Sequence, residues 1–231
     1  MGEYPKLMML QTCPFCWKVR SLLEHLKIDF IEDQLNPLRR KKSLKFAGDW
    51  GKVPIWRESE EDFVIDSTPI MLHIDKKYNN SKLSNNNLDM VRQEEWLRWV
   101  DEKLSKATIP ILYGSIGSAL SSTRTVSKLE KFGLLSRHLY AWTGFPIMWG
   151  IIAKTRVKKD GRKPKKLWHD LLDEFVEQFD GKPFFGGDAP NIVDIAAFGI
   201  VRSISPFKQF REIKSHKLGM KWYDSILGTL N

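Results

Sequence analysis

The two cysteines of the chain are the residues best suited to chemistry, and they lie together as Cys13-Pro14-Phe15-Cys16. Pro14 suits the first turn of a helix, where its missing N–H leaves no partner unsatisfied. Cys13 would then stand at the helix N-terminus, where free N–H groups and the helix dipole stabilise a thiolate and lower the thiol pKa. We therefore expect Cys13 to be the nucleophile, and Cys16, about one turn further along, to resolve a mixed disulfide on Cys13.

Two other roles for this cysteine pair stay open at this point, a half metal site and an inert pair. A structural zinc site would need about two further ligands, and none of the five histidines is paired with another at a suitable spacing. A bridge within one CxxC closes almost no loop, so it would add little stability. These arguments favour redox or thiol chemistry and no metal site, with Lys18 and Arg20 adding positive charge nearby.

The pattern of apolar residues predicts the elements that hold the cysteine pair. Residues 6–11 and 28–32 have the pattern of strands, and residues 14–26 between them carry apolar side chains at helical spacing. A basic helix is expected from Asn36-Pro37 to Phe46, strands over 53–57 and 62–65, and a helix over 67–78. This order is that of a thioredoxin-like domain, which we place at residues 1–79.

Two further motifs would face the cysteines in such a domain. Val53-Pro54 begins a predicted strand and resembles the cis-proline that faces a reactive cysteine, which would leave the Val53 backbone free to hold a peptide-like thiol such as glutathione. An ordinary edge-strand proline is the alternative. Asp66-Ser67 precedes a predicted helix, and Ser67 is expected to cap that helix, to receive a ligand carboxylate, or both.

The chain that follows the thioredoxin-like domain is predicted to be mostly helical. Residues 80–87 are polar and have linker composition, and residues 88–231 form the expected all-helical domain. Amphipathic helices are predicted over 88–104 and 167–179, a buried helix over 192–204, and helices without defined ends across 120–160. Asn191 and Asp194 have the spacing of a capping box at the start of the buried helix.

The formal charge of +9 is unevenly placed. Residues 1–80 hold 13 Lys and Arg against 12 Asp and Glu, and residues 154–166 hold eight basic residues against one acid. A run of this kind is typical of a solvated loop, and a patch for anionic ligands, membrane surface or nucleic acid is the alternative. Because no aromatic residue interrupts the run, nucleic acid is not expected as a partner.

The composition also bears on whether the chain crosses a membrane and on the cellular compartment of the protein. The longest apolar stretch, residues 145–153, is far shorter than the ~20 residues that a membrane-spanning helix needs. No signal peptide is recognised at the start of the chain. We therefore expect a cytoplasmic protein without a transmembrane segment.

Taken in order along the chain, these motifs resemble the glutathione S-transferase fold with a glutaredoxin-type centre. Within that fold the chain is similar to the soluble part of the membrane-associated prostaglandin E synthases of type 2. The matching stretches are residues 12–16, 18–20, 36–37, 39–40, 52–55, 183–184, 186–187, 190–191 and Asp194. That branch carries a tyrosine three positions before its first cysteine, where this chain has Leu10.

The resemblance implies a glutathione- or thiol-dependent transferase or oxidoreductase that uses Cys13 and Cys16. Glutathione or another small thiol would be held by Phe15, Val53, Pro54, Asp66 and Ser67. The partners would be this thiol and an apolar or disulfide cosubstrate, with a second copy of the chain in a homodimer as a further candidate. The alternatives are an isomerase like the prostaglandin E synthases, with Phe15, Leu112, Tyr113 and Trp149 as candidate channel residues, and a non-catalytic binding module of the same fold.

Overall fold

A four-stranded sheet forms the centre of the N-terminal part of the molecule. The computed structural model describes residues 5–85, 90–132, 149–150, 155 and 161–230. The strand order is β2-β1-β3-β4, in which β1 is parallel to β2 and antiparallel to β3, and β3 is antiparallel to β4. The strands are β1 (Lys6–Met9), β2 (Ile31–Gln34), β3 (Ile55–Arg57) and β4 (Phe63–Ile65). This mixed sheet is the arrangement that the predicted thioredoxin-like order requires.

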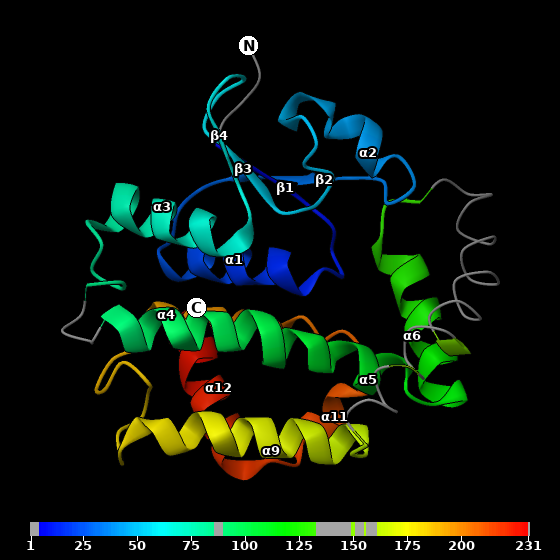
Figure 1. Cartoon of the computed structure of the whole chain (residues 1–231), viewed down its shortest axis with the longest axis vertical. Coiled ribbons are helices and arrows are strands. Elements are labelled where there is room, and N and C mark those ends of the chain that lie inside the picture. The colour runs from blue at the N-terminus through cyan, green and yellow to red at the C-terminus, as the bar shows by residue number, and fades with distance from the viewer. Residues whose placement is uncertain (1–4, 86–89, 133–148, 151–154, 156–160, 231) are drawn as a thin grey trace.

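Three helices accompany the sheet. They are α1 (Pro14–His25), α2 (Arg40–Ser43), which runs on into a 3-10 turn at Lys45–Ala47, and α3 (Ser67–Asn79). Figure 1 shows α1 and α3 lying between the sheet and the long helix that begins with α4. The first residues of α1 and α3 therefore lie where the sheet and the helical part of the molecule meet.

The helical part begins with one long rod that changes pitch along its length. α4 (Met90–Trp99) continues through a π-helical turn at Val100–Leu104 and a 3-10 turn at Ser105–Ala107 into α5 (Thr108–Tyr113). The remaining helices are α6 (Ile116–Leu129), α9 (Pro164–Val176) with a 3-10 turn at Glu177–Phe179, α10 (Ile192–Arg202), α11 (Phe210–Lys214) and α12 (Lys217–Thr229). Within the described residues, no helix combines the length and apolar character needed to cross a bilayer.

Helix α10 joins the two parts of the core. Its residues 192–201 are all buried, as the apolar sequence predicts, and it packs against α1. The predicted capping box is confirmed, since Asn191 accepts the Asp194 N–H and the Asp194 carboxylate accepts the Asn191 N–H. Asp194 also accepts the indole N–H of Trp222 from α12, so one buried carboxylate ties the start of α10 to a second helix.

Several elements differ from their predicted bounds. β2 begins at Ile31 rather than residue 28, because the parallel register with β1 pairs Ile31 with Lys6. The basic helix is a single α-turn plus a 3-10 turn, and α11 and α12 have no counterpart in the sequence prediction. Of the basic run, Lys154 and residues 156–160 lie outside the described residues, while Arg162 and Lys166 both pair with Asp170.

Candidate thiol site

Cys13 occupies the N-cap of α1. Its backbone is extended, and its carbonyl accepts the N–H groups of Cys16 at 3.0 Å and Trp17 at 3.2 Å, which starts the helix. The Cys13 thiol is half-buried and lies 4.0 Å from the carbonyl oxygen of Val53, whereas Cys16 is fully buried. Both cysteines are free thiols, so the arrangement is that of a reduced pair with one accessible member.

The two thiols differ in pKa. The hydrogen bond from the Cys16 thiol lowers the pKa of Cys13, and the backbone N–H groups of Cys16 and Phe15 lower it further, against the opposing effects of burial and of the Glu130 charge. Burial raises the pKa of Cys16 well above its ordinary value, and the neighbouring Cys13 raises it further. Cys13 is therefore the thiol that ionises first.

The two cations expected to assist Cys13 are engaged elsewhere. Lys18 is fully buried, and its ammonium lies 2.5 Å from the carboxylate of Asp101. Arg20 pairs with Glu24 at 2.7 Å and Glu32 at 3.0 Å. The groups that lower the pKa of Cys13 are the Cys16 thiol and the backbone N–H groups of Cys16 and Phe15, so the assistance expected from Lys18 and Arg20 stays a prediction.

The Val53–Pro54 peptide bond is cis, as predicted. Both residues are buried, and β3 starts directly after them at Ile55. The carbonyl of Val53 faces Cys13 across the space between the end of β1 and the start of β3. The structure thus brings together residues that lie 40 positions apart in the sequence.

Asp66 and Ser67 form the turn from β4 into α3. Asp66 has a positive φ of 69°, and its side chain accepts the N–H of Ser67 at 2.7 Å. Ser67 is 1% exposed, and its hydroxyl has no hydrogen-bond partner among the described residues. The sequence predicts that Ser67 caps the helix, but the N-cap residue is Asp66.

Glu130 belongs to the site although the sequence does not point to it. This buried residue follows α6, and its carboxylate accepts the N–H of Gln11 at 3.2 Å, the N–H of Thr12 at 2.7 Å and the hydroxyl of Thr12 at 2.5 Å. Burial raises the pKa of Glu130, although the bonds from Thr12 and Gln11 oppose this. Glu130 thereby fixes the turn that leads into Cys13.

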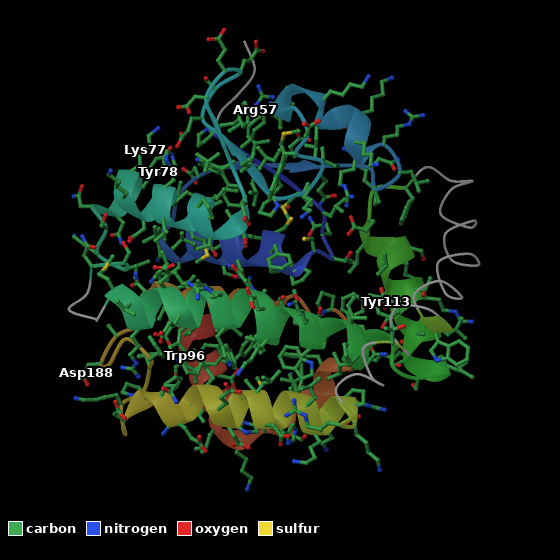
Figure 2. The ribbon with its side chains drawn as sticks, viewed as in Figure 1. Arg57, Lys77, Tyr78, Trp96, Tyr113 and Asp188 are labelled. Carbon is green, nitrogen blue, oxygen red and sulfur yellow. The ribbon has the colours of Figure 1, made fainter. Side chains whose placement is uncertain are left out.

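A cavity of about 210 Å³ lies beside the start of α1. Its lining joins the cysteine turn to α5, α6 and the segment after α10, and Tyr113 stands at the α5 end of the long helix (Figure 2). Of the four candidate channel residues, Leu112 and Tyr113 line this cavity, while Phe15 and Trp149 do not. The lining residues are Thr12, Pro14, Thr108, Ile109, Leu112, Tyr113, Val126, Ser203 and Phe207.

The sequence of the chain is similar to one known domain family and to proteins of the same name from two organisms. Residues 7–82 match the family described as glutathione S-transferase, N-terminal domain. The chain is 26% identical to prostaglandin E synthase 2 of Danio rerio, over 95% of this chain and 69% of the relative. It is 24% identical to the protein of the same name from Mus musculus, over 94% of this chain and 68% of the relative.

Solved structures show the same architecture. Glutathione S-transferase III in its apo form covers 97% of this chain with a TM-score of 0.66 and 13% identity, and 92% of that chain is matched. Glutathione S-transferase I with bound lactoylglutathione covers 99% of this chain with a TM-score of 0.66 and 14% identity, and 97% of that chain is matched. The protein therefore has the glutathione S-transferase fold, and its residues 7–82 match the glutathione S-transferase N-terminal domain family.

Proposed function

We propose that the protein is a glutathione-dependent thiol–disulfide oxidoreductase or transferase with Cys13 as its nucleophile. The observation that carries this proposal is the geometry of Cys13, which is the N-cap residue of α1 and whose thiol has a lowered pKa and lies 4.0 Å from the Val53 carbonyl oxygen. A half-buried thiol with a lowered pKa is the kind of cysteine that attacks disulfides and electrophiles. The fully buried Cys16, whose pKa is raised, suits the second role of resolving thiol.

In a disulfide reaction, the Cys13 thiolate attacks one sulfur of the substrate. A new S–S bond forms to Cys13 while the substrate S–S bond breaks, and the leaving sulfur takes the electron pair and a proton from solvent. Cys16 then loses its proton and attacks the Cys13 sulfur, which releases the second substrate thiol and leaves a Cys13–Cys16 disulfide. The substrate gains two electrons and the cysteine pair loses two.

The start of α3 fits the carboxylate of a peptide-like thiol. The buried hydroxyl of Ser67 has no partner among the described residues, and it lies at the N-terminus of a 13-residue helix, whose dipole favours an anion. The exposed carboxylate of Asp66 is positioned to pair with an ammonium group of the same ligand. One glutathione bound there would attack the Cys13–Cys16 disulfide and form a mixed disulfide on Cys13, and a second glutathione would release it as glutathione disulfide and return both cysteines to thiols.

A second candidate function is isomerisation of an apolar substrate. It is favoured by the similarity to proteins named prostaglandin E synthase 2 and by the cavity that Leu112 and Tyr113 line beside Pro14. In that reaction Cys13 would act on the substrate without a net change in its own redox state. Assays for formation of prostaglandin E and for reduction of a disulfide distinguish the two functions.

The proposed function is tested by glutathione binding and by reduction of a glutathionylated peptide. Wild type, Cys13→Ser, Cys16→Ser and Ser67→Ala are compared by calorimetric titration with glutathione and by a coupled assay of peptide reduction. We expect Cys13→Ser to abolish turnover, and Ser67→Ala to weaken glutathione binding while the Cys13 alkylation rate stays unchanged. Full turnover by Cys13→Ser would refute the assignment of the nucleophile, and a wild type that neither binds glutathione nor reduces the peptide would refute the function.

A further inference from the structure

Lys18, Thr68 and Asp101 form a closed cycle of hydrogen bonds between three helical segments. The ammonium of Lys18, on α1, donates to the Asp101 carboxylate at 2.5 Å and to the Thr68 hydroxyl at 2.8 Å. The Thr68 hydroxyl donates to the other oxygen of Asp101 at 2.8 Å. Asp101 lies in the π-helical turn that follows α4, and such turns often mark functional positions.

The positive charge of Lys18 in this cycle lies in the protein interior, where only a specific arrangement of partners can hold it. Lys18 is 0% exposed, and burial lowers its pKa while the negative charges of Asp101 and Asp66 oppose that shift. A buried ion pair gains little stability over apolar residues of similar size. The cycle is therefore better explained by the geometry it enforces than by the stability it adds.

What the cycle holds is the first turn of α3. Thr68 follows Ser67 directly, and Asp66 before it has φ 69° and ψ 139°, a backbone conformation that residues other than glycine rarely adopt. Such a conformation persists when its surroundings fix it. The Asp66 carbonyl also accepts the Ile70 N–H at 3.0 Å, the first helical bond of α3. Fixing Thr68 thus fixes both residues of the proposed carboxylate site.

We propose that Thr68 is a positioning residue, through which Lys18 and Asp101 hold the start of α3 in the geometry that binds the thiol ligand. This inference rests on the proposed function and adds a route by which the helical part of the molecule controls ligand affinity. Because Cys13 is the N-cap residue of α1 and Lys18 lies within that helix, the same helix sets the distance between the reacting sulfur and the carboxylate site. Thr68 itself is not required to touch the ligand.

The test compares Thr68→Val with Thr68→Ser in the full chain. Valine keeps the shape of threonine but lacks the hydroxyl, so it opens the cycle while Lys18 and Asp101 remain paired; serine keeps the hydroxyl. Thr125→Val is the matched control, because among the described residues the hydroxyl of this half-buried threonine bonds only to the Ser121 carbonyl of its own helix. Three quantities are measured: hydrogen exchange of the Ile70 amide, the glutathione Kd, and the pH dependence of Cys13 alkylation.

We expect Thr68→Val to speed Ile70 exchange and to raise the glutathione Kd about tenfold, the size of a lost charge-assisted hydrogen bond. Thr68→Ser and Thr125→Val should match wild type, and the alkylation profile should stay unchanged in all three variants. Wild-type affinity in Thr68→Val overturns the proposal, whether or not exchange is faster. If wild type does not bind glutathione, the proposed function fails, and Ile70 exchange alone decides: faster exchange supports the positioning role and an unchanged rate overturns it.

Discussion

The carboxylate of Glu130, directly after α6, accepts the backbone N–H of Thr12, the residue before Cys13, at 2.7 Å. The two residues are 118 positions apart, so the turn that presents the reactive cysteine is shaped from the helical part of the molecule. The Glu130 charge also raises the pKa of Cys13 and so opposes the groups that lower it. Glu130 therefore fixes the turn at the expense of thiolate stability.

Glu130→Gln should lower the pKa of Cys13 further. Glutamine keeps an oxygen for the Thr12 N–H but removes the negative charge that opposes ionisation of the thiol. The midpoint of Cys13 alkylation by iodoacetamide, followed against pH by intact mass, should move to lower pH. Glu94→Gln is the control, because Glu94 is exposed and pairs with Arg98 on the same helix. A midpoint that stays in place or rises would show that the Glu130 charge does not act on Cys13.

Cys13 should react before Cys16, and Cys16 should set its reactivity. At a limiting dose, iodoacetamide is expected to modify Cys13 first, because Cys16 is fully buried and has a raised pKa. Cys16→Ala removes the thiol donor that lowers the pKa of Cys13. The alkylation midpoint of Cys13 should then rise in Cys16→Ala and rise less in Cys16→Ser, since serine keeps a donor. Preferential labelling of Cys16 in wild type would reverse the assigned roles.

Glu58 is expected to stabilise the fold near neutral pH and to lose this effect in acid. Burial of its carboxyl raises the pKa, but hydrogen bonds from Tyr78, Trp56, His73 and Lys77 outweigh this and lower it from 4.5 to about 2. Tyr78 and Lys77 lie beside each other on α3 (Figure 2), so Glu58 ties the end of β3 to that helix. Because the folded-state pKa is depressed, the stabilisation is present above about pH 4.5 and is lost as pH falls toward 2.

Glu58→Gln tests this relationship by urea unfolding across the pH range. The variant should be less stable than wild type at pH 7 and should lose less stability between pH 4.5 and 2. Glu61→Gln, at an exposed position of the same hairpin, should follow the wild-type curve. Parallel curves for Glu58→Gln and wild type would mean that Glu58 does not contribute to the pH dependence.

The parts of the site that the sequence predicts are those with local signals. The local spacing of Cys13, Pro14 and Cys16 places them at the first turn of a helix. The spacing of Asn191 and Asp194 indicates a capping box within four residues. The thioredoxin-like order and the buried α10 follow from periodicity, because each element carries its own apolar pattern. Domain limits, the homodimer, the cytoplasmic location and the roles of the site residues stay predictions.

The parts that the sequence does not predict depend on partners far along the chain. Glu130 closes the turn at Thr12, and nothing near either residue indicates the other. Lys18 has a weak signal, since it stands four positions before Leu22 on the apolar side of α1, where a lysine needs a buried partner. That partner, Asp101, lies in a π-turn that helical periodicity does not reveal.

The contact between α1 and α10 gives the sharpest test of the packing around the site. A Cβ placed on Gly199 of α10 would lie 2.6 Å from the Cα of Lys18 and 2.6 Å from the carbonyl oxygen of Trp17. Both atoms belong to backbone, which cannot swing aside as the end of a side chain can. Gly199→Ala should therefore push the two helices apart and lower the free energy of unfolding by about 3 kcal/mol, the upper end of the usual overpacking cost.

Gly228→Ala is the matched control, because this glycine of α12 has open space where its Cβ would lie. Alanine forms helix better than glycine by up to ~1 kcal/mol, so the control should be as stable as wild type or slightly more stable. Urea unfolding of both variants measures the difference. Since α1 begins at the cysteine pair, Gly199→Ala should also slow Cys13 alkylation at fixed pH, whereas Gly228→Ala should not. Wild-type stability in Gly199→Ala would show that α1 and α10 do not pack backbone against backbone at this point.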